Sequence, residues 1–190
     1  AVPPMFDRLA RVAADGKRDL SQVVYSISGA MTLTPAVVGR WEKLAGSMLN
    51  EGYGMTETSP VALANPFDDA RKIGAIGIPF PSTDIRVVRQ SEPGGEVELG
   101  EIGELLIAGP QVFQGYWNRP QDSAEALLDG GWLRTGDLVV QDEDGFVTVV
   151  DRKQDMIITG GFNVSPSEVE AVVDSVPGVA ESAVVGLARG

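Results

Sequence analysis

The feature that most constrains the fold is a change of pattern along the chain. Up to about residue 72, short apolar runs alternate with segments of helical periodicity. The run 23–28 predicts a strand, Thr34 followed by Pro35 predicts the start of a helix, and 48–50 predicts a second strand. A strand, a helix and a strand in this order predict two parallel strands joined by a crossover helix. The first region is therefore predicted to be part of an α/β layer, preceded by a helix over 4–14.

A second pattern begins after about residue 72. Short β-rich runs bounded by Gly, Pro and Asp predict a small antiparallel sheet, with a hairpin connection at 142–145. One helix interrupts these runs; it is predicted to begin near Pro120 and to include Leu127 and Leu128. The predicted strands are 85–88, 103–108, 139–141 and 146–150.

A third pattern begins near Asp151. The run 156–159 predicts a strand, and Ser165-Pro166-Ser167-Glu168 has the form of a capping box that opens a helix to about Ser175. The run 183–186 predicts another strand, and the unit is too small to be a complete domain. The predicted fold is α/β with a small antiparallel β subdomain: a partial large N-terminal domain followed by the truncated start of a small α+β C-terminal domain.

Composition removes several kinds of chemistry. The 190 residues include no Cys and no His, which excludes disulfides, thiolate nucleophiles, Ser-His-Asp hydrolysis and His-based metal sites. A net charge of −12 disfavours binding to nucleic acid. No stretch approaches the ~20 apolar residues of a membrane span, and no signal peptide is recognisable at the start. These features predict a cytoplasmic protein without a transmembrane segment, and they leave room for peripheral membrane contact. They carry no signal for an oligomeric state.

The segment Gly52-Tyr53-Gly54-Met55-Thr56-Glu57-Thr58 is the first candidate for a binding site. Its glycines let the backbone approach a ligand closely, and the Tyr53 ring offers a stacking face. Thr56 offers a hydroxyl to a phosphate oxygen, and Glu57 offers a hard oxygen ligand to Mg²⁺. By itself the segment is equally compatible with a strand-to-loop turn that has an incidental polar tail.

Two further segments become informative only in combination with the first. In Trp132–Leu138, Asp137 can accept two hydrogen bonds from a vicinal diol such as that of a ribose. In Asp151–Asp155, Arg152 can pair with a phosphate or a ribose hydroxyl. Each alone is better explained structurally, as a turn cap and as a charged linker. The order of the three segments favours a nucleotide site.

The sequence resembles the superfamily of acyl-CoA synthetases, luciferases and nonribosomal peptide adenylation domains over essentially its whole length. The motifs that carry the resemblance are GYGMTE at 52–57, GELLIAGPQVFQGYW at 103–117, WLRTGDL at 132–138 and DRKQDMIITGGFNVSPSEVE at 151–170. Three features are most similar to bacterial long-chain fatty acid–CoA ligases: VPPMF near the start, SGAM at 28–31 and GFNVSPSEVE.

The resemblance implies a two-step reaction. A fatty acid and ATP give an acyl-adenylate and pyrophosphate, and the thiol of CoA then displaces AMP. It also implies a division into 1–75, part of the α/β layer of the N-terminal domain, 76–150, its β subdomain, and 151–190, the hinge and truncated start of a mobile C-terminal domain. ATP or AMP, Mg²⁺ and CoA are the implied cofactors and co-substrates.

Residue roles follow from the same resemblance. Thr56 and Glu57 are the implied catalytic residues, with Glu57 as the Mg²⁺ ligand, Asp151 as the hinge and Gly161 in the CoA channel. Tyr53 is expected against the adenine ring and Asp137 on the ribose hydroxyls. The implied nucleotide-binding set is Gly29, Ala30, Met31, Gly52, Tyr53, Gly54, Met55, Thr56, Asp137, Val149 and Arg152.

The chain also departs from the family pattern. The Gly- and Ser/Thr-rich phosphate loop and the C-terminal lysine of the family have no counterpart in these 190 residues, and Gln154 stands where the family has a second hinge lysine. We therefore expect this chain alone not to make acyl-CoA. Two alternatives stay open: a ligase that delivers the adenylate to a carrier protein, and a non-catalytic nucleotide-binding or scaffolding piece.

Overall fold

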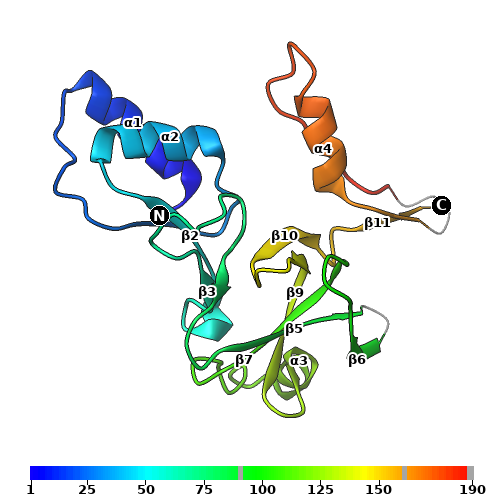
Figure 1. Cartoon of the computed structure of the whole chain (residues 1–190). Coiled ribbons are helices and arrows are strands. Elements are labelled where there is room, and N and C mark those ends of the chain that lie inside the picture. Colours follow the sequence, from blue (N-terminus) through cyan, green and yellow to red (C-terminus); the bar gives the residue numbers. More distant parts are fainter. Residues whose placement is uncertain (90–91, 160–161, 188–190) are drawn as a thin grey trace.

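The computed structural model describes residues 1–89, 92–159 and 162–187. Its first part, the N-terminal layer, contains helices α1 (Pro3–Asp15) and α2 (Pro35–Ala45) and strands β1 (Ser26–Ser28) and β2 (Leu49–Tyr53). The two helices lie against each other beside the strands (Figure 1). Strands β1 and β2 pair in parallel, which confirms the predicted strand–helix–strand unit. Two short antiparallel strands, β3 (Leu63–Ala64) and β4 (Ile78–Pro79), extend this sheet.

Apolar residues at helical spacing explain why α1 and α2 form and pack. Both helices begin with a proline, whose fixed φ suits the first helical turn. Phe6 of α1 meets Trp41 of α2 edge to face with ring centroids 4.8 Å apart, and Trp41 donates a hydrogen bond of 2.9 Å to Ser26 of β1. Thr34 stands at the predicted N-cap of α2, but its side chain makes no capping hydrogen bond. The helix is therefore held by its packed face.

The β subdomain is a six-stranded antiparallel sheet in the order β10-β9-β7-β5-β6, with β8 paired to β9. Its core consists of fully buried Leu, Ile and Val side chains such as Leu105, Ile107, Val139 and Val147. The strands are β5 (Asp84–Arg89), β6 (Glu92–Glu96), β7 (Gly103–Ala108), β8 (Leu127–Leu128), β9 (Trp132–Gln141) and β10 (Val147–Arg152). The predicted hairpin at 142–145 is the connection between β9 and β10.

The core of the β subdomain also joins it to the N-terminal layer. Ala62 and Leu63 lie in the same buried cluster as Leu105 and Val139, and the Tyr53 ring packs against it. Backbone hydrogen bonds reinforce the contact: Val147 N donates to Gly77 O (2.9 Å) and its carbonyl accepts from Ile76 N (2.8 Å). The end of β2 is thus fixed relative to β9 and β10.

Two predicted elements differ in the structure. Helix α3 (Pro120–Ala126) ends before Leu127, because Leu127 and Leu128 pair with Leu133 and Trp132 as strand β8. The predicted strand over 183–186 is irregular. A local pattern cannot reveal either outcome, because both depend on which partner strand is within reach.

The C-terminal unit comprises residues 153–187 as far as they are described. It contains the antiparallel hairpin β11 (Ile157–Thr159) and β12 (Phe162–Val164), and helix α4 (Pro166–Asp174), which projects away from the β subdomain (Figure 1). Ser165 caps α4 by accepting a hydrogen bond from Glu168 N (3.3 Å), which is one of the two hydrogen bonds of the predicted capping box. Within the residues that the structure describes, none of the helices has the length and apolar character needed to cross a bilayer.

Candidate active site

The turn that follows β2 is shaped by one glycine and one threonine. A Cβ at Gly54 would collide with the carbonyl of Pro60, so only glycine fits this close approach. The Thr58 hydroxyl accepts from Met55 N (2.9 Å) and donates to Met55 O (3.0 Å), which closes the short helix η1 (Thr56–Thr58). The turn therefore presents Met55, Thr56 and Glu57 in a fixed order at the end of a buried strand.

Glu57 is held by a second loop, which follows β7. Its backbone carbonyl accepts from Phe113 N (2.8 Å), and its carboxylate oxygen Oε1 accepts from the hydroxyl of Tyr116 (2.6 Å). The hydrogen bond to Glu57 raises the pKa of Tyr116 to about 12, so the phenol remains a donor at neutral pH. One carboxylate oxygen of Glu57 therefore accepts a hydrogen bond from a second loop.

Asp137 lies on β9, and each of its two carboxylate oxygens has a different partner. Tyr53 donates a hydrogen bond of 2.5 Å from its hydroxyl to Asp137 Oδ2, and Arg152 Nε lies 3.7 Å from Oδ1. Burial and the neighbouring Asp137 charge raise the pKa of Tyr53, which keeps its hydroxyl protonated. The pairing of β9 with β10 places Arg152 opposite Asp137. The structure therefore brings three motifs together that are far apart in the sequence.

A cavity of about 450 Å³ opens where these motifs meet. It carries two carboxylates and two cations, an arrangement that can receive a ligand with both hydroxyl donors and anionic oxygens. Its lining residues are Met55, Glu57, Thr135, Gly136, Asp137, Arg152, Lys153 and Gln154. Because Gly136 lacks a side chain and has a φ of +73°, the backbone can turn beside Asp137 without obstructing the cavity.

The other predicted site residues lie outside this lining. Gly29, Ala30 and Met31 follow β1 and adjoin the end of β2, since a Cβ at Gly29 would lie 3.0 Å from Gly52 O. Ala30 is held at a φ of +65°, and the Met31 side chain is 56% exposed.

The remaining predicted residues have different surroundings. Thr56 is exposed beside Glu57, and Gly52 and Gly54 shape the turn. Val149 packs against the core of the β subdomain. Gly161, predicted for the CoA channel, lies outside the described residues.

Glu104 is a site neighbour that sequence reasoning missed. Its carboxylate, on β7, is 3% exposed and accepts hydrogen bonds from Arg134 Nε (3.1 Å) and Nη2 (2.8 Å) and from Lys153 Nζ (2.9 Å). Burial alone would raise the pKa of Glu104, but these hydrogen bonds outweigh it and lower the pKa below its ordinary value. The signal in the sequence is an acidic residue inside an otherwise apolar strand, which needs a buried partner.

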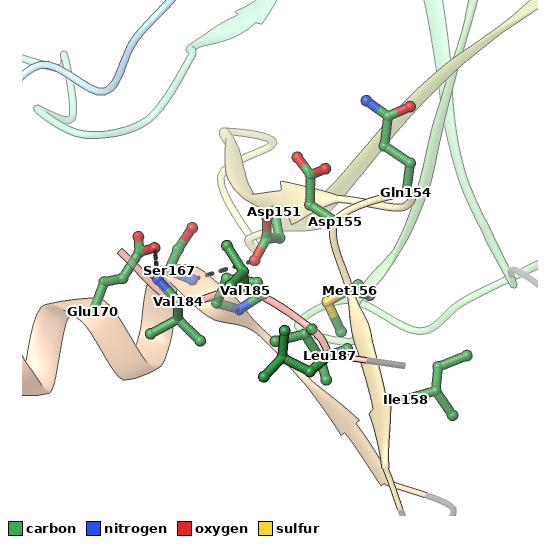
Figure 2. Close-up of a pocket in the computed structure, with 13 residues that line it drawn as sticks. Asp151, Gln154, Asp155, Met156, Ile158, Ser167, Glu170, Val184, Val185 and Leu187 are labelled. Carbon is green, nitrogen blue, oxygen red and sulfur yellow. Dashed lines mark hydrogen bonds between the residues drawn. The ribbon is translucent and has the colours of Figure 1, made fainter. Parts of the chain in front are cut away.

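A second cavity, of about 640 Å³, lies in the C-terminal unit and is drawn in Figure 2. Asp151 lies at its edge: Asp151 Oδ2 accepts from the hydroxyl of Ser165 (2.7 Å) and, at 3.5 Å, from Ser167 N. Glu170, which also lines this cavity, accepts a hydrogen bond from Val184 N (2.7 Å). The predicted hinge residue is thus the last buried carboxylate before the C-terminal unit and also supports the start of α4.

Comparison with known proteins assigns this fold and site to a protein family. The AMP-binding enzyme family matches residues 1–117. The chain is 50% identical over 169 residues to a long-chain-fatty-acid–CoA ligase of Yersinia pestis, covering 89% of this chain and 30% of the relative. It is 44% identical over 189 residues to the ligase of the same name from Escherichia coli O157:H7, covering 100% of this chain and 33% of the relative. The chain thus spans about a third of the length of these relatives.

Solved structures agree with this assignment. ATP-bound MatB from Rhodopseudomonas palustris matches with a TM-score of 0.82 at 38% identity, over 97% of this chain and 36% of that one. The apo form of MatB matches with a TM-score of 0.76, over 99% of this chain and 37% of that one. The chain belongs to the AMP-binding enzyme family, and its fold is that of adenylate-forming enzymes.

Proposed function

We propose that this chain is part of an AMP-forming acid–thiol ligase whose acid is a long-chain fatty acid. In the first step a carboxylate oxygen of the acid attacks the α-phosphorus of ATP, and pyrophosphate leaves. In the second step the sulfur of CoA attacks the acyl carbon, and AMP leaves. The observation that carries the proposal is the arrangement of Asp137, Glu57 and Arg152 around one cavity, since they come from three distant motifs.

Asp137 is the proposed ribose-binding residue. A carboxylate can accept hydrogen bonds from both hydroxyls of a vicinal diol, and the Tyr53 hydroxyl fixes its orientation. Arg152 lies within 3.7 Å of the same carboxylate and can add a hydrogen bond to the ribose or to a phosphate. Tyr53 thus has two proposed functions: its ring lies against the adenine, and its hydroxyl orients Asp137.

Glu57 is proposed to contribute to a Mg²⁺ site that is completed by the substrate. Among the described residues there is no cluster of three or more carboxylates that could hold a metal by itself. Mg²⁺ commonly takes only one or two protein carboxylates and completes its shell with phosphate oxygens and water. Glu57, whose Oε1 is oriented by the Tyr116 hydroxyl and which lines the cavity, fits such a shared site. The bound ion would offset the charge of the phosphates, and Thr56 would bind one phosphate oxygen.

The remaining roles concern the acyl group and CoA. Gly29, Ala30 and Met31 adjoin the β2 turn and are proposed to line the adenine and acyl carbonyl region, with Val149 behind the nucleotide. Gly161 is proposed for the pantetheine channel and Asp151 for the hinge. The relatives named as CoA ligases favour CoA over a carrier protein as the acceptor. Fatty acid, ATP and CoA are then the small-molecule partners, and the reaction belongs to the cytoplasm.

The proposal is tested by nucleotide affinity in the full-length protein. Asp137→Ala removes the acceptor of the ribose hydroxyls, and we expect ATP binding to weaken by about 1.5–3 kcal/mol, measured by titration calorimetry. Asp144→Ala is the matched control, because it removes the same charge from an exposed hairpin and should leave the affinity unchanged. Equal ATP affinity in wild type and Asp137→Ala would contradict the proposed role of the cavity.

A further inference from the structure

Glu104 joins three segments of the chain at one buried point. It lies on β7, Arg134 lies on β9, and Lys153 follows directly after β10. The Glu104 side chain is 3% exposed, whereas those of Arg134 and Lys153 are 28% and 33% exposed. A buried carboxylate is costly unless it is paired and hydrogen-bonded, so at least one of these cations must always stay with Glu104.

The two cations are held in different ways. Arg134 binds both carboxylate oxygens through the two sides of its guanidinium, and it belongs to a central strand of the subdomain. Lys153 makes one hydrogen bond to Oε2, through a flexible side chain that reaches water. Arg134 can therefore keep the Glu104 carboxylate paired when the Lys153 side chain moves away. The movement of Lys153 then leaves no buried charge without a partner.

Lys153 is the first residue beyond β10 and the second beyond Asp151. Its backbone N donates to Gly136 O (2.8 Å), and its Nζ donates to Glu104 Oε2 (2.9 Å). These two hydrogen bonds connect the start of the C-terminal unit to the β subdomain. A second contact is made by the Asp151 carboxylate, which accepts hydrogen bonds from the Ser165 hydroxyl and from Ser167 N at the beginning of α4. Figure 2 shows the contact between Asp151 and Ser167. A rotation about Asp151 would leave the hydrogen bonds of the Asp151 carboxylate close to the pivot. It would break the hydrogen bond between Lys153 and Glu104.

We propose that Glu104 is a positioning residue: it holds Lys153, and with it the C-terminal unit, in the orientation for adenylate formation and releases Lys153 when the unit turns for thioester formation. This inference rests on the proposed function above. It is supported by the position of Lys153, which lines the same cavity as Glu57 and Asp137 while its Nζ lies 2.9 Å from Glu104 Oε2. Arg134 keeps Glu104 paired in both orientations.

The test measures the two half-reactions separately in the full-length protein. Adenylate formation is followed by exchange of pyrophosphate into ATP, and thioester formation by adding CoA to preformed acyl-adenylate. Lys153→Met removes the charge and keeps the aliphatic stem, so we expect the ratio of the thioester rate to the adenylation rate to rise on the order of 3-fold to 10-fold. Lys153→Arg keeps the cation and should restore the ratio toward that of wild type.

A double substitution ties the effect to Glu104. In a Glu104→Gln background, Lys153→Met should change the ratio by less than 2-fold, because the contact is already weakened. Lys153→Gln serves as a second variant if Lys153→Met does not fold. An unchanged ratio in a folded Lys153 variant, or an equal loss in both steps, would overturn the inference. A wild-type protein that forms no adenylate would instead overturn the proposed function, so the two failures can be told apart.

Discussion

The β subdomain and the C-terminal unit differ sharply in how they are held. In the subdomain, side chains such as Leu105, Ile107 and Val139 are fully buried, and adjacent strands pair along most of their length. In the C-terminal unit, apolar side chains remain open to solvent, including Ile158 (76% exposed) and Leu187 (88%). One region has a core of its own, and the other is held mainly at its junction with the first.

This difference matches what the proposed chemistry needs. Asp137 and Arg134 lie on β9, inside the hydrogen-bonded sheet, so the carboxylate that we propose to bind the ribose keeps its geometry. Asp151 and Lys153 lie at the edge of that sheet, where a change in orientation breaks few contacts. Binding and positioning groups on rigid elements, with moving parts beyond them, are typical of enzymes that close or rearrange between steps.

The largest expected effect comes from breaking the subdomain core. Leu105→Ala removes a fully buried side chain and leaves a cavity, so we expect a loss of about 3 kcal/mol in the free energy of unfolding. Leu187→Ala makes the same chemical change at an exposed position and should cost less than about 0.5 kcal/mol. Urea-induced unfolding of both variants checks the difference. Similar losses for the two variants would mean that the regions are equally well packed.

A smaller effect concerns the charge buried at the junction. The pKa of Glu104 is lowered in the folded state, so the unfolded state binds more protons as the pH falls below about 4.5. The contribution of Glu104 to stability is therefore complete above that pH and is lost as the pH falls through the folded-state pKa. Glu104→Gln should cost about 2 kcal/mol at pH 7.

Measuring the free energy of unfolding at several pH values supplies the control for this prediction. As the pH is lowered from 7, the wild type and Glu104→Gln should keep a constant difference in unfolding free energy down to about pH 4.5 and should converge below it, because protonation removes the charge of Glu104 in the wild type. A difference between the two proteins that stays constant below this pH as well would show that the loss comes from packing and not from the charge.

The smallest expected effect is local to α4. Ser165→Ala removes the N-cap of this helix and the hydrogen bond to Asp151, and we expect α4 to open more easily by about 1 kcal/mol. Amide hydrogen exchange should become faster in α4 and stay unchanged in β9. Ser175→Ala, which removes a hydroxyl hydrogen bond at the other end of α4, is the matched control. Faster exchange in β9 as well would show that the two regions unfold together.

Local sequence signals predicted the elements that depend on neighbouring residues. The parallel pairing of β1 and β2 follows from a strand–helix–strand order, and the start of α4 follows from Ser165-Pro166. Strand β8 was predicted as helix, because Leu127 and Leu128 suit either state and only their pairing with β9 decides. The strand predicted at 183–186 was wrong for the same reason.

The site shows the same limit. The sequence indicated Asp137, Arg152 and Glu57, and the structure places all three around one cavity. It could not indicate that Tyr53 orients Asp137 or that Glu104 holds Lys153, because these contacts join residues 84 and 49 positions apart. Such pairs are determined by the sheet register, which a local pattern does not contain.

We propose that the sheet of the β subdomain carries the nucleotide site while the C-terminal unit turns about Asp151. The most direct measurement compares both half-reactions in full-length Asp151→Pro and Asp151→Ala, because both variants lose the side chain and only proline fixes φ near −65°. We predict that Asp151→Pro retains adenylate formation near the level of Asp151→Ala but loses most of its thioester formation, with ATP affinity unchanged. Equal losses of the two half-reactions in Asp151→Pro, relative to Asp151→Ala, would contradict rotation about this residue.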